Sequence, residues 1–287
     1  MKLNSKTAKF LMIFIMMARG TGFLFSKTLL LDFHPFNVLG LRFSLAFIVL
    51  ALIYIKKWKT VDKNTLVGGL ILGVFYTLVM SLEMYSLRKI DTGTTSFTAH
   101  AAIIIVPFYE FLIFHKKPMK KTLLCALLAF LGIGCLSLCN GVTQINSGIL
   151  FAICEAFAYA ACILITSIVS KKGDPVLQGT IQLGTMGILS LCLSFIVTGD
   201  VMLPWKTSHF LMLLSLALIC SCFGFAMQPL AQKHLDADTA AMMTAINPMT
   251  ASMIGIFVAH ENHGIVKILG YLLILSGILI CLRKKEN

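Results

Sequence analysis

Charged residues are scarce in this 287-residue chain. They make up 13% of it, whereas about a quarter of the residues in a soluble globular domain are charged. Hydrophobic residues account for 58%. A soluble domain of this length has no single core large enough to hide so much apolar surface, which excludes a soluble enzyme or binding module. The composition instead predicts an all-α polytopic membrane protein.

Acidic residues are scarcer still, because 12 Asp and Glu stand against 24 Lys and Arg. The net charge of +12 could suggest nucleic acid, but the basic residues do not form one patch. They are distributed among short connections between apolar segments. We therefore expect the lipid bilayer as a partner and no nucleic acid. A secretory cleavage site is also missing after the first apolar run, so we interpret that run as a membrane span.

Metal-binding and redox motifs are missing as well. The nine cysteines contain no C-x-x-C pair and almost all lie in apolar segments, where they are small packing residues. His260-Glu261-Asn262-His263 is one residue short of H-E-x-x-H, whose histidines must be four apart to share a helix face. We expect no metal, no cofactor and no disulfide.

What is present is a series of apolar runs, each of about 20 residues, the length that crosses a bilayer as a helix. We predict ten transmembrane helices, at residues 10–31, 36–55, 65–87, 93–114, 120–138, 147–170, 176–198, 207–232, 238–259 and 264–282. Most Lys and Arg outside these spans fall on one side if the N-terminus is cytoplasmic. The prediction is a multi-pass cell-membrane protein, in a bacterial plasma membrane, with both termini in the cytoplasm.

An internal repeat divides the chain into a first half, residues 1–140, and a second half, residues 141–287. Pro35 and Pro175 begin the second and seventh spans at an offset of 140, and Pro107 and Pro248 lie in the fourth and ninth at 141. Five spans is an odd number, so the halves enter the membrane from opposite sides. Two inverted five-helix repeats in one membrane domain are typical of secondary transporters, with the substrate between the repeats.

Short motifs then resemble one family. Arg19 to Lys27 is similar to the Trp-Gly-x-x-Phe-x-x-x-Lys pattern of EamA-type transporters of the drug/metabolite transporter superfamily, with Arg19 in place of Trp. Leu41-Arg42-Phe43 matches a second-span motif, and Pro248 to Glu261 matches the spacing of a proline and a later Gly-Glu. The resemblance implies a ten-helix fold whose cavity is lined by spans 1, 3, 4, 6, 8 and 9. Members move small organic solutes, including amino acids, amines and nucleobases.

Charged residues inside the spans are the candidate site residues, since each is costly to place in lipid. Arg19 is deep enough that we expect it to line the cavity and bind a carboxylate or phosphate. Lys27 and Arg42 either face the cavity or, as structural residues, snorkel or pair with Glu83. Glu155 either receives an amine or forms a salt bridge with Arg19 or Lys27.

Aromatic and polar residues share faces with these charges at helical spacing. Phe23 follows Arg19 on one face, Tyr159 follows Glu155, and Tyr76 precedes Glu83. His100 is a candidate proton carrier or a hydrogen-bonded packing residue. The predicted substrate-binding set is Arg19, Phe23, Lys27, Tyr76, Glu83, His100, Glu155, Tyr159 and Asn247, with Pro107 and Pro248 as candidate hinges.

The function we predict is transport of a small organic metabolite. Arg19 with Glu155 favours an amino acid or related zwitterion, with an organic cation or amine as the next choice. Proton coupling through Glu83, Glu155 or His100 is an open alternative. An intramembrane enzyme would need a nucleophile motif such as G-x-S-x-G, which is missing, while a channel or sensor on a similar fold stays open. A monomer and a homodimer are both compatible with the sequence.

Overall fold

A computed structural model gives the fold of the chain. It describes residues 4–90, 92–115, 117, 120–137, 147–258 and 264–282, and in these residues the secondary structure is helical throughout. The elements are α1 (Ser5–Gly20), α2 (Gly22–Leu29), α3 (Pro35–Ile53), η1 (Ile55–Thr60), α4 (Lys63–Lys89), α5 (Thr92–Ala99), α6 (Ala102–Phe114), α7 (Lys120–Ser137), α8 (Ser147–Val169), α9 (Pro175–Thr198), α10 (Thr207–Ser215), η2 (Leu216–Phe225), α11 (Gln228–Gln232), α12 (Ala237–Met243), α13 (Ile246–Val258) and α14 (Ile265–Leu282).

Several of these helices are long and apolar enough to cross a membrane. Within the described residues there are seven such runs: Ser5–Leu29, Pro35–Ile53, Lys63–Lys89, Thr95–Phe114, Ser147–Val169, Pro175–Thr198 and Thr207–Gln232. A shorter apolar helix covers Ile268–Ile280. Helices occupy all ten of the predicted ranges. The multi-pass architecture is therefore confirmed, while the number of ten crossings stays a prediction.

Local capping explains where the long helices begin. Asp62 precedes α4, and its Oδ1 accepts a hydrogen bond from the Thr65 backbone nitrogen at 3.0 Å. Asp174 precedes α9 and accepts from the backbone nitrogens of Val176 and Leu177, with Pro175 at the first helical position. A side-chain acceptor satisfies the free amides of the first turn, and a proline in that turn has no N–H that needs a partner. These residues therefore fix where α4 and α9 begin.

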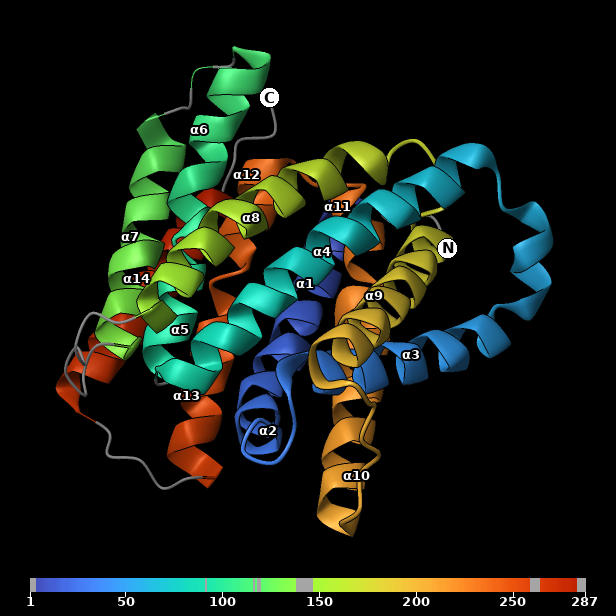
Figure 1. The fold of residues 1–287 in the computed structure, drawn as a ribbon. Helices are drawn as coiled ribbons and strands as arrows, with labels where there is room; N and C mark the ends of the chain where they lie inside the picture. Colours follow the sequence, from blue (N-terminus) through green and yellow to red (C-terminus); the bar gives the residue numbers. More distant parts are fainter. Residues whose placement is uncertain are drawn as a thin grey trace.

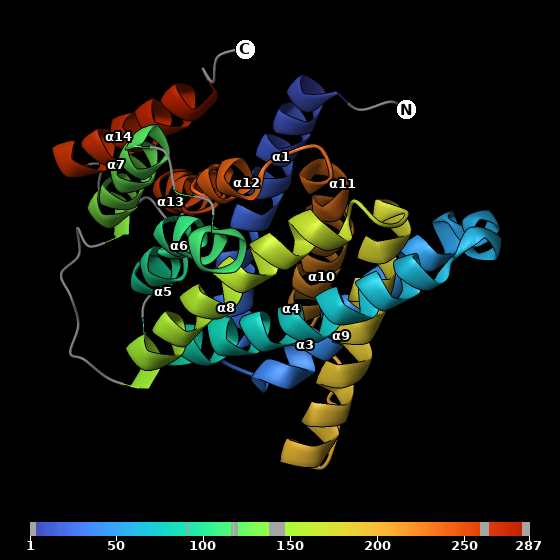
Figure 2. The same cartoon turned by 90° about the horizontal axis from the view of Figure 1, so that it is seen from above.

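Helices from the two halves of the chain pack against each other rather than forming separate bundles. Figures 1 and 2 show α3 beside α9, α4 beside α8 and α9, and α7 beside α14. Small residues let the backbones approach closely, as is usual between membrane helices. A Cβ atom on Gly73 of α4 would lie 2.3 Å from Cβ of Thr185 in α9.

Four of the predicted spans, at residues 10–31, 93–114, 207–232 and 238–259, contain a short break in the helix, which in the eighth span lies at Ala226 and Met227. The first breaks at Thr21, the fourth at His100 and Ala101, and the ninth at Thr244 and Ala245. At the latter two breaks a backbone amide bonds three residues back, from Ile103 to His100 and from Asn247 to Thr244, which tightens the turn and ends the α-helix. In the eighth span, Leu216–Phe225 forms a π-helix.

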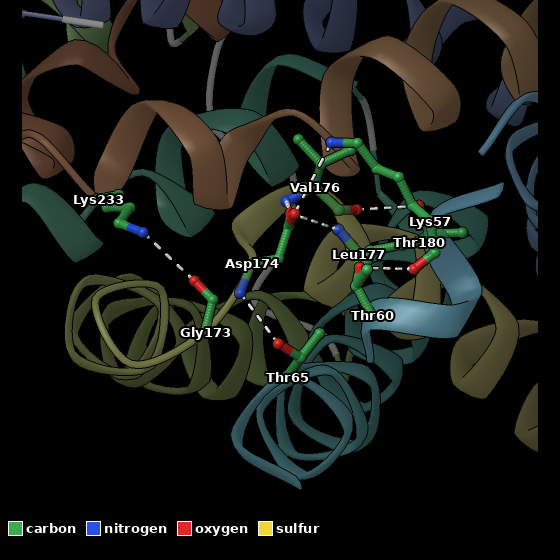
Figure 3. A network of polar contacts seen from close by, with 9 residues as sticks. All are labelled: Lys57, Thr60, Thr65, Gly173, Asp174, Val176, Leu177, Thr180 and Lys233. Carbon is green, nitrogen blue, oxygen red and sulfur yellow. Dashed lines mark hydrogen bonds and ion pairs between the residues drawn. The ribbon is translucent and has the colours of Figure 1, made fainter. Parts of the chain in front are cut away.

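One face of the bundle is closed by polar contacts between the halves (Figure 3). From the first half, the Thr65 hydroxyl accepts from the Asp174 backbone nitrogen at 2.9 Å, and the Lys57 ammonium lies 3.7 Å from the Asp174 carboxylate. Within the second half, the ammonium of Lys233, directly after α11, donates to the Gly173 backbone oxygen at 3.3 Å. The turn between α8 and α9 is thereby tied to the start of α4.

A second set of polar contacts closes the part of the bundle where α3 begins. The Asn37 side chain and the Met202 backbone exchange two hydrogen bonds, of 2.7 and 3.0 Å. The Asp32 carboxylate lies 3.0 Å from Nε2 of His209 and 3.6 Å from the Lys206 ammonium. Each contact joins a residue of the first half to one of the second.

Candidate functional site

Arg19 is held at the centre of the bundle by residues from other helices. It lies in the last turn of α1 and is 7% exposed. Its Nη1 donates to Oε1 of Gln228 at 2.7 Å and to Oη of Tyr159 at 3.2 Å, and its guanidinium carbon lies 4.1 Å from the centre of the Phe225 ring. Among the described residues no other hydrogen bond uses this side chain, so Nε and Nη2 are available for a ligand.

Gln228 connects Arg19 to α4. Its amide oxygen accepts from Arg19 and its Nε2 donates to Oη of Tyr76 at 2.9 Å, so both ends of the side chain are satisfied. Tyr76 and Gln228 are each 1% exposed. A buried polar network with every member partnered fixes side-chain positions strongly, and this one orients the guanidinium.

Arg42 is a second buried guanidinium. It is 3% exposed, its Nε donates to Oγ of Ser221 at 2.7 Å, and the ring of Phe43 lies 5.0 Å from its guanidinium carbon. Arg42 is buried and does not snorkel to the surface; it lines the same cavity as Glu83, although no ion pair within 4.0 Å joins the two among the described residues. The π-helix of the eighth span supplies Ser221 and Phe225 as partners, so the charge is accommodated inside the bundle.

Glu83 and Glu155 lie between α4 and α8, close enough for their carboxyl groups to interact directly. Glu155 is 1% exposed and its Oε2 has no partner among the described residues, whereas Glu83 is partly exposed. Among the described residues, no ion pair joins Glu155 to Arg19 or Lys27, the pairing that the sequence left open. Arg19 is engaged by Tyr159 and Gln228, and Lys27 points elsewhere.

The Lys27 ammonium binds the end of α4. It donates to the backbone oxygens of Leu87 and Ile90, the latter at 2.6 Å. Carbonyls at a helix C-terminus carry partial negative charge, so a cation is favourable there. The structure therefore places Lys27 outside the set of residues that surround Arg19.

A small cavity lies beside the guanidinium of Arg19, and its lining comes from both halves of the chain. It is lined by Arg19, Gly22, Phe23, Ser26, Arg42, Met80, Glu83, Phe225 and Asn247. The space measures about 10 Å³, which is room for about one water molecule. A cavity of this size holds no organic solute, so a larger ligand fits only if the surrounding helices move apart.

Other predicted residues form a layer behind this cavity. Tyr76, Tyr159 and Glu155 contact the lining residues Arg19 and Glu83 directly or through Gln228. The ring of His100 lies 6.0 Å from that of Tyr159, with its Nδ1 against the Ser96 backbone oxygen at 2.7 Å.

Both candidate hinge prolines are buried. Pro107 lies inside α6, and Pro248 lies in the first turn of α13, next to Asn247. Their role as hinges stays a prediction.

Several residues of the site were not in the predicted substrate-binding set. The cavity is also lined by Gly22, Ser26, Arg42, Met80 and Phe225, and Gln228 and Ser221 bind the two arginines. Gln228 carried a usable signal, because an amide next to Pro229 in an apolar span needs a polar partner. Ser221 and Phe225 carried none, since a serine and a phenylalanine in an apolar run are ordinary. Only the π-helix brings them to the arginines.

In the part of the chain that the structure describes, no cluster of three or more His, Cys, Asp or Glu side chains is suited to a metal ion. The tetrapeptide at residues 260–263 lies outside the described residues.

Membrane-crossing helices around a buried charged cavity are typical of a polytopic membrane transporter. The chain belongs to the EamA-like transporter family, whose sequence profile matches residues 6–138 and again residues 146–283.

Two relatives are named uncharacterized transporters. One, from Archaeoglobus fulgidus, is 22% identical and aligns over 77% of each chain; the other, from Clostridium kluyveri, is 25% identical and aligns over 86% of this chain and 83% of its own. A solved crystal structure, 14% identical, superposes with a TM-score of 0.77 over 96% of each chain, which shows the fold alone. The family and the relatives' names indicate a transporter rather than an enzyme.

Proposed function

We propose that the protein is a secondary transporter that moves a small carboxylate-bearing metabolite, an amino acid or related zwitterion first, by alternating access between two inverted five-helix repeats. The observation that carries this proposal is the charged cavity beside Arg19. Residues of both halves line it, and it contains two guanidinium groups and one carboxyl group.

Helix neighbours support the inverted repeat. Number the ten helical segments in chain order, so that segments 1 to 5 correspond to segments 6 to 10 of the other repeat. Replacing each member of a packed pair by its counterpart in the other repeat gives another packed pair. The pair α4 and α8 corresponds to η2 and α1, and α6 and α8 corresponds to α13 and α1, while α3 with α9 and α7 with α14 correspond to themselves. The interruptions in the fourth and ninth segments are related in the same way.

The Arg19–Tyr159 hydrogen bond supports the same symmetry. The two residues are 140 positions apart, which is the offset that aligns the spans before and after them. Equivalent positions of two repeats meet only close to the axis that relates them. Arg19 therefore lies near this axis, where a rocking motion of the halves leaves a bound group in place.

The charges around the cavity favour a zwitterion. The free edges of Arg19 and Arg42 suit a carboxylate, which takes two parallel hydrogen bonds from one guanidinium. Glu83 lines the same cavity and suits an ammonium group, and Phe23 and Phe225 provide apolar and aromatic surface for the rest of the molecule. Both charges of an amino acid would be matched within one site.

The membrane orientation is part of the proposal. With the N-terminus in the cytoplasm, the contacts of Lys57, Asp174 and Lys233 lie on the cytoplasmic face of a bacterial plasma membrane and those of Asn37 and Asp32 on the outer face. Figure 2 shows the first turn of α1 and the last turn of α14 at the same edge of the bundle, which supports placing both termini on one side.

The test is a thermal-shift panel on the purified protein in detergent, because a ligand that binds the folded state raises its unfolding midpoint. The probes are L-leucine, L-phenylalanine and L-threonine as zwitterions, choline as a cation, uracil as a neutral base and glucose 6-phosphate. We expect stabilisation by at least one amino acid in the wild type.

Two matched variants locate the carboxylate. Arg19→Lys keeps the charge but loses the planar fork, so the amino-acid shift should disappear, since hydrogen bonds to a charged group are worth about 1.5–3 kcal/mol. Arg88→Lys makes the same change at an exposed arginine and should leave the shift intact. Stabilisation by choline alone, unchanged in Arg19→Lys, would contradict the zwitterion proposal.

A further inference from the structure

The contact between Glu83 and Glu155 has a chemical consequence. Two ionised carboxylates have only acceptor atoms, so they cannot form a hydrogen bond, and at contact distance they repel each other strongly. A shared proton turns the same geometry into a donor and an acceptor. Glu155 is almost completely buried with Oε2 unpartnered, and no ion pair joins either carboxyl group to an arginine among the residues that the structure describes.

The surroundings of the pair are cationic or neutral. The charged and titratable side chains around it are Arg19 from α1, Arg42 from α3, Tyr76 from α4, His100 from the turn between α5 and α6, and Tyr159 and Cys162 from α8, with the Lys27 ammonium bound to the end of α4. Glu83 reaches the cavity and Glu155 lies behind it.

We infer that the Glu83–Glu155 pair is a proton-binding site that exchanges its proton for the ammonium group of the substrate, so that the carrier runs as a proton–amino acid exchanger. This inference rests on the proposed function and adds the coupling ion to it. The residues bring one proton site and one ammonium site onto the same carboxyl group, so the two cations compete.

Counting charges in the cavity shows why the exchange is favourable. Without substrate, two guanidinium groups and a pair that holds one proton leave a net charge of +1. A bound zwitterion places an ammonium against Glu83, which favours ionisation of the pair. Release of the proton then leaves two positive and two negative groups around a neutral ligand. No covalent bond changes, and the proton leaves to water when the site opens.

The first experiment needs no substrate. Infrared spectra of the purified protein at neutral pH record the carbonyl stretch of protonated carboxyl groups. The wild type should show this band, and Glu155→Gln should lose it, because Glu83 then ionises beside two arginines. Glu110→Gln, at a partly exposed glutamate of α6, is the matched control and should keep the band. A band of equal size in Glu155→Gln would overturn the inference.

The second experiment uses the wild type, so it does not depend on the folding of a variant. Calorimetry in two buffers of different ionisation enthalpy counts the protons released when the amino acid with the largest thermal shift binds. About one proton per ligand should appear, and Kd should fall about tenfold for each unit of rising pH while the pair is protonated. The des-amino analogue, 3-phenylpropionate for L-phenylalanine, should release none.

The two experiments distinguish a failure of proton exchange from a failure of amino-acid binding. Binding without proton release, or with uptake, would overturn the exchange and leave the transporter proposal standing. If no amino acid bound at all, the zwitterion proposal would fail and the exchange that rests on it would fail too, while the infrared band would still decide whether the pair holds a proton.

Discussion

Replacing Thr65 with valine should open one face of the protein without changing its shape. Thr65 is 1% exposed at the start of α4, and its hydroxyl accepts the backbone N–H of Asp174 from the opposite half at 2.9 Å. Valine has nearly the same volume but cannot accept this bond. The closed arrangement of this face therefore loses stability relative to the open one.

The size of the effect follows from the contacts. Loss of the neutral hydrogen bond to the Asp174 backbone costs the closed face about 1 kcal/mol, and partial access of water to Asp174 keeps this cost from being larger. The Thr65 hydroxyl also bonds the Asp62 carboxylate, but that bond lies within the cap of α4, so its loss acts on the open and closed arrangements alike. The nearby Lys57–Asp174 ion pair is unchanged and contributes little, because its side chains are 49% and 35% exposed. A cost of 1 kcal/mol corresponds to about a fivefold increase in the open population.

Hydrogen exchange followed by mass spectrometry measures this opening without labels. Peptides that cover residues 171–178 should exchange about five times faster in Thr65→Val, because their amides exchange through the open state. Thr60→Val is the matched control, since the Thr60 hydroxyl bonds only within η1, to the Lys57 backbone oxygen at 2.8 Å (Figure 3). Peptides around Met202, on the opposite face, should exchange no faster.

Two results would refute the reasoning. If residues 171–178 exchange at the wild-type rate in Thr65→Val, the bond does not hold the face closed. If the peptides around Met202 accelerate equally, the substitution destabilises the whole fold and does not open one side.

Three further predictions concern packing, the polar network and pH. Gly20→Ala places a Cβ 2.6 Å from the Asn247 backbone oxygen, so the crossing of α1 and α13 must shift, and thermal unfolding should show a loss of about 1–3 kcal/mol. Gln228→Leu removes the buried hydrogen bonds with both Arg19 and Tyr76 and should cost about 2–4 kcal/mol, well above the cost of Tyr76→Phe, measured in the same way. Hydrogen bonds from Thr65 hold the pKa of Asp62 below its usual value. The carboxylate therefore stabilises the fold fully at pH values above its usual pKa, and this contribution is lost as pH falls through the lowered pKa. Asp62→Asn should flatten the decline of the unfolding midpoint in acid.

The sequence was sufficient to locate the helices and the inner face of the first span. Arg19, Phe23 and Ser26 fall on one helical stripe and are buried, whereas Met17 and Leu24 on the other side are 43% and 40% exposed. Periodicity reports such a division directly, because lipid and a polar interior demand different side chains.

The pairing of the charges could not be predicted, because it depends on side chains that are distant in sequence. Arg42 is buried only because a π-helix in the eighth span turns Ser221 toward it. Glu155 meets Glu83 because Gln228 and Tyr159 already occupy Arg19. Local spacing fixes which face a residue lies on, and the packing of several helices decides what it meets there.

Counterflow in proteoliposomes tests the central claim most directly. Vesicles with wild-type protein, preloaded with an unlabelled mixture of amino acids, should accumulate the labelled amino acid identified by thermal shift; Arg88→Lys should do the same, and Arg19→Lys should not. Equal accumulation in Arg19→Lys, or none in the wild type, would contradict a carrier that binds its substrate at Arg19.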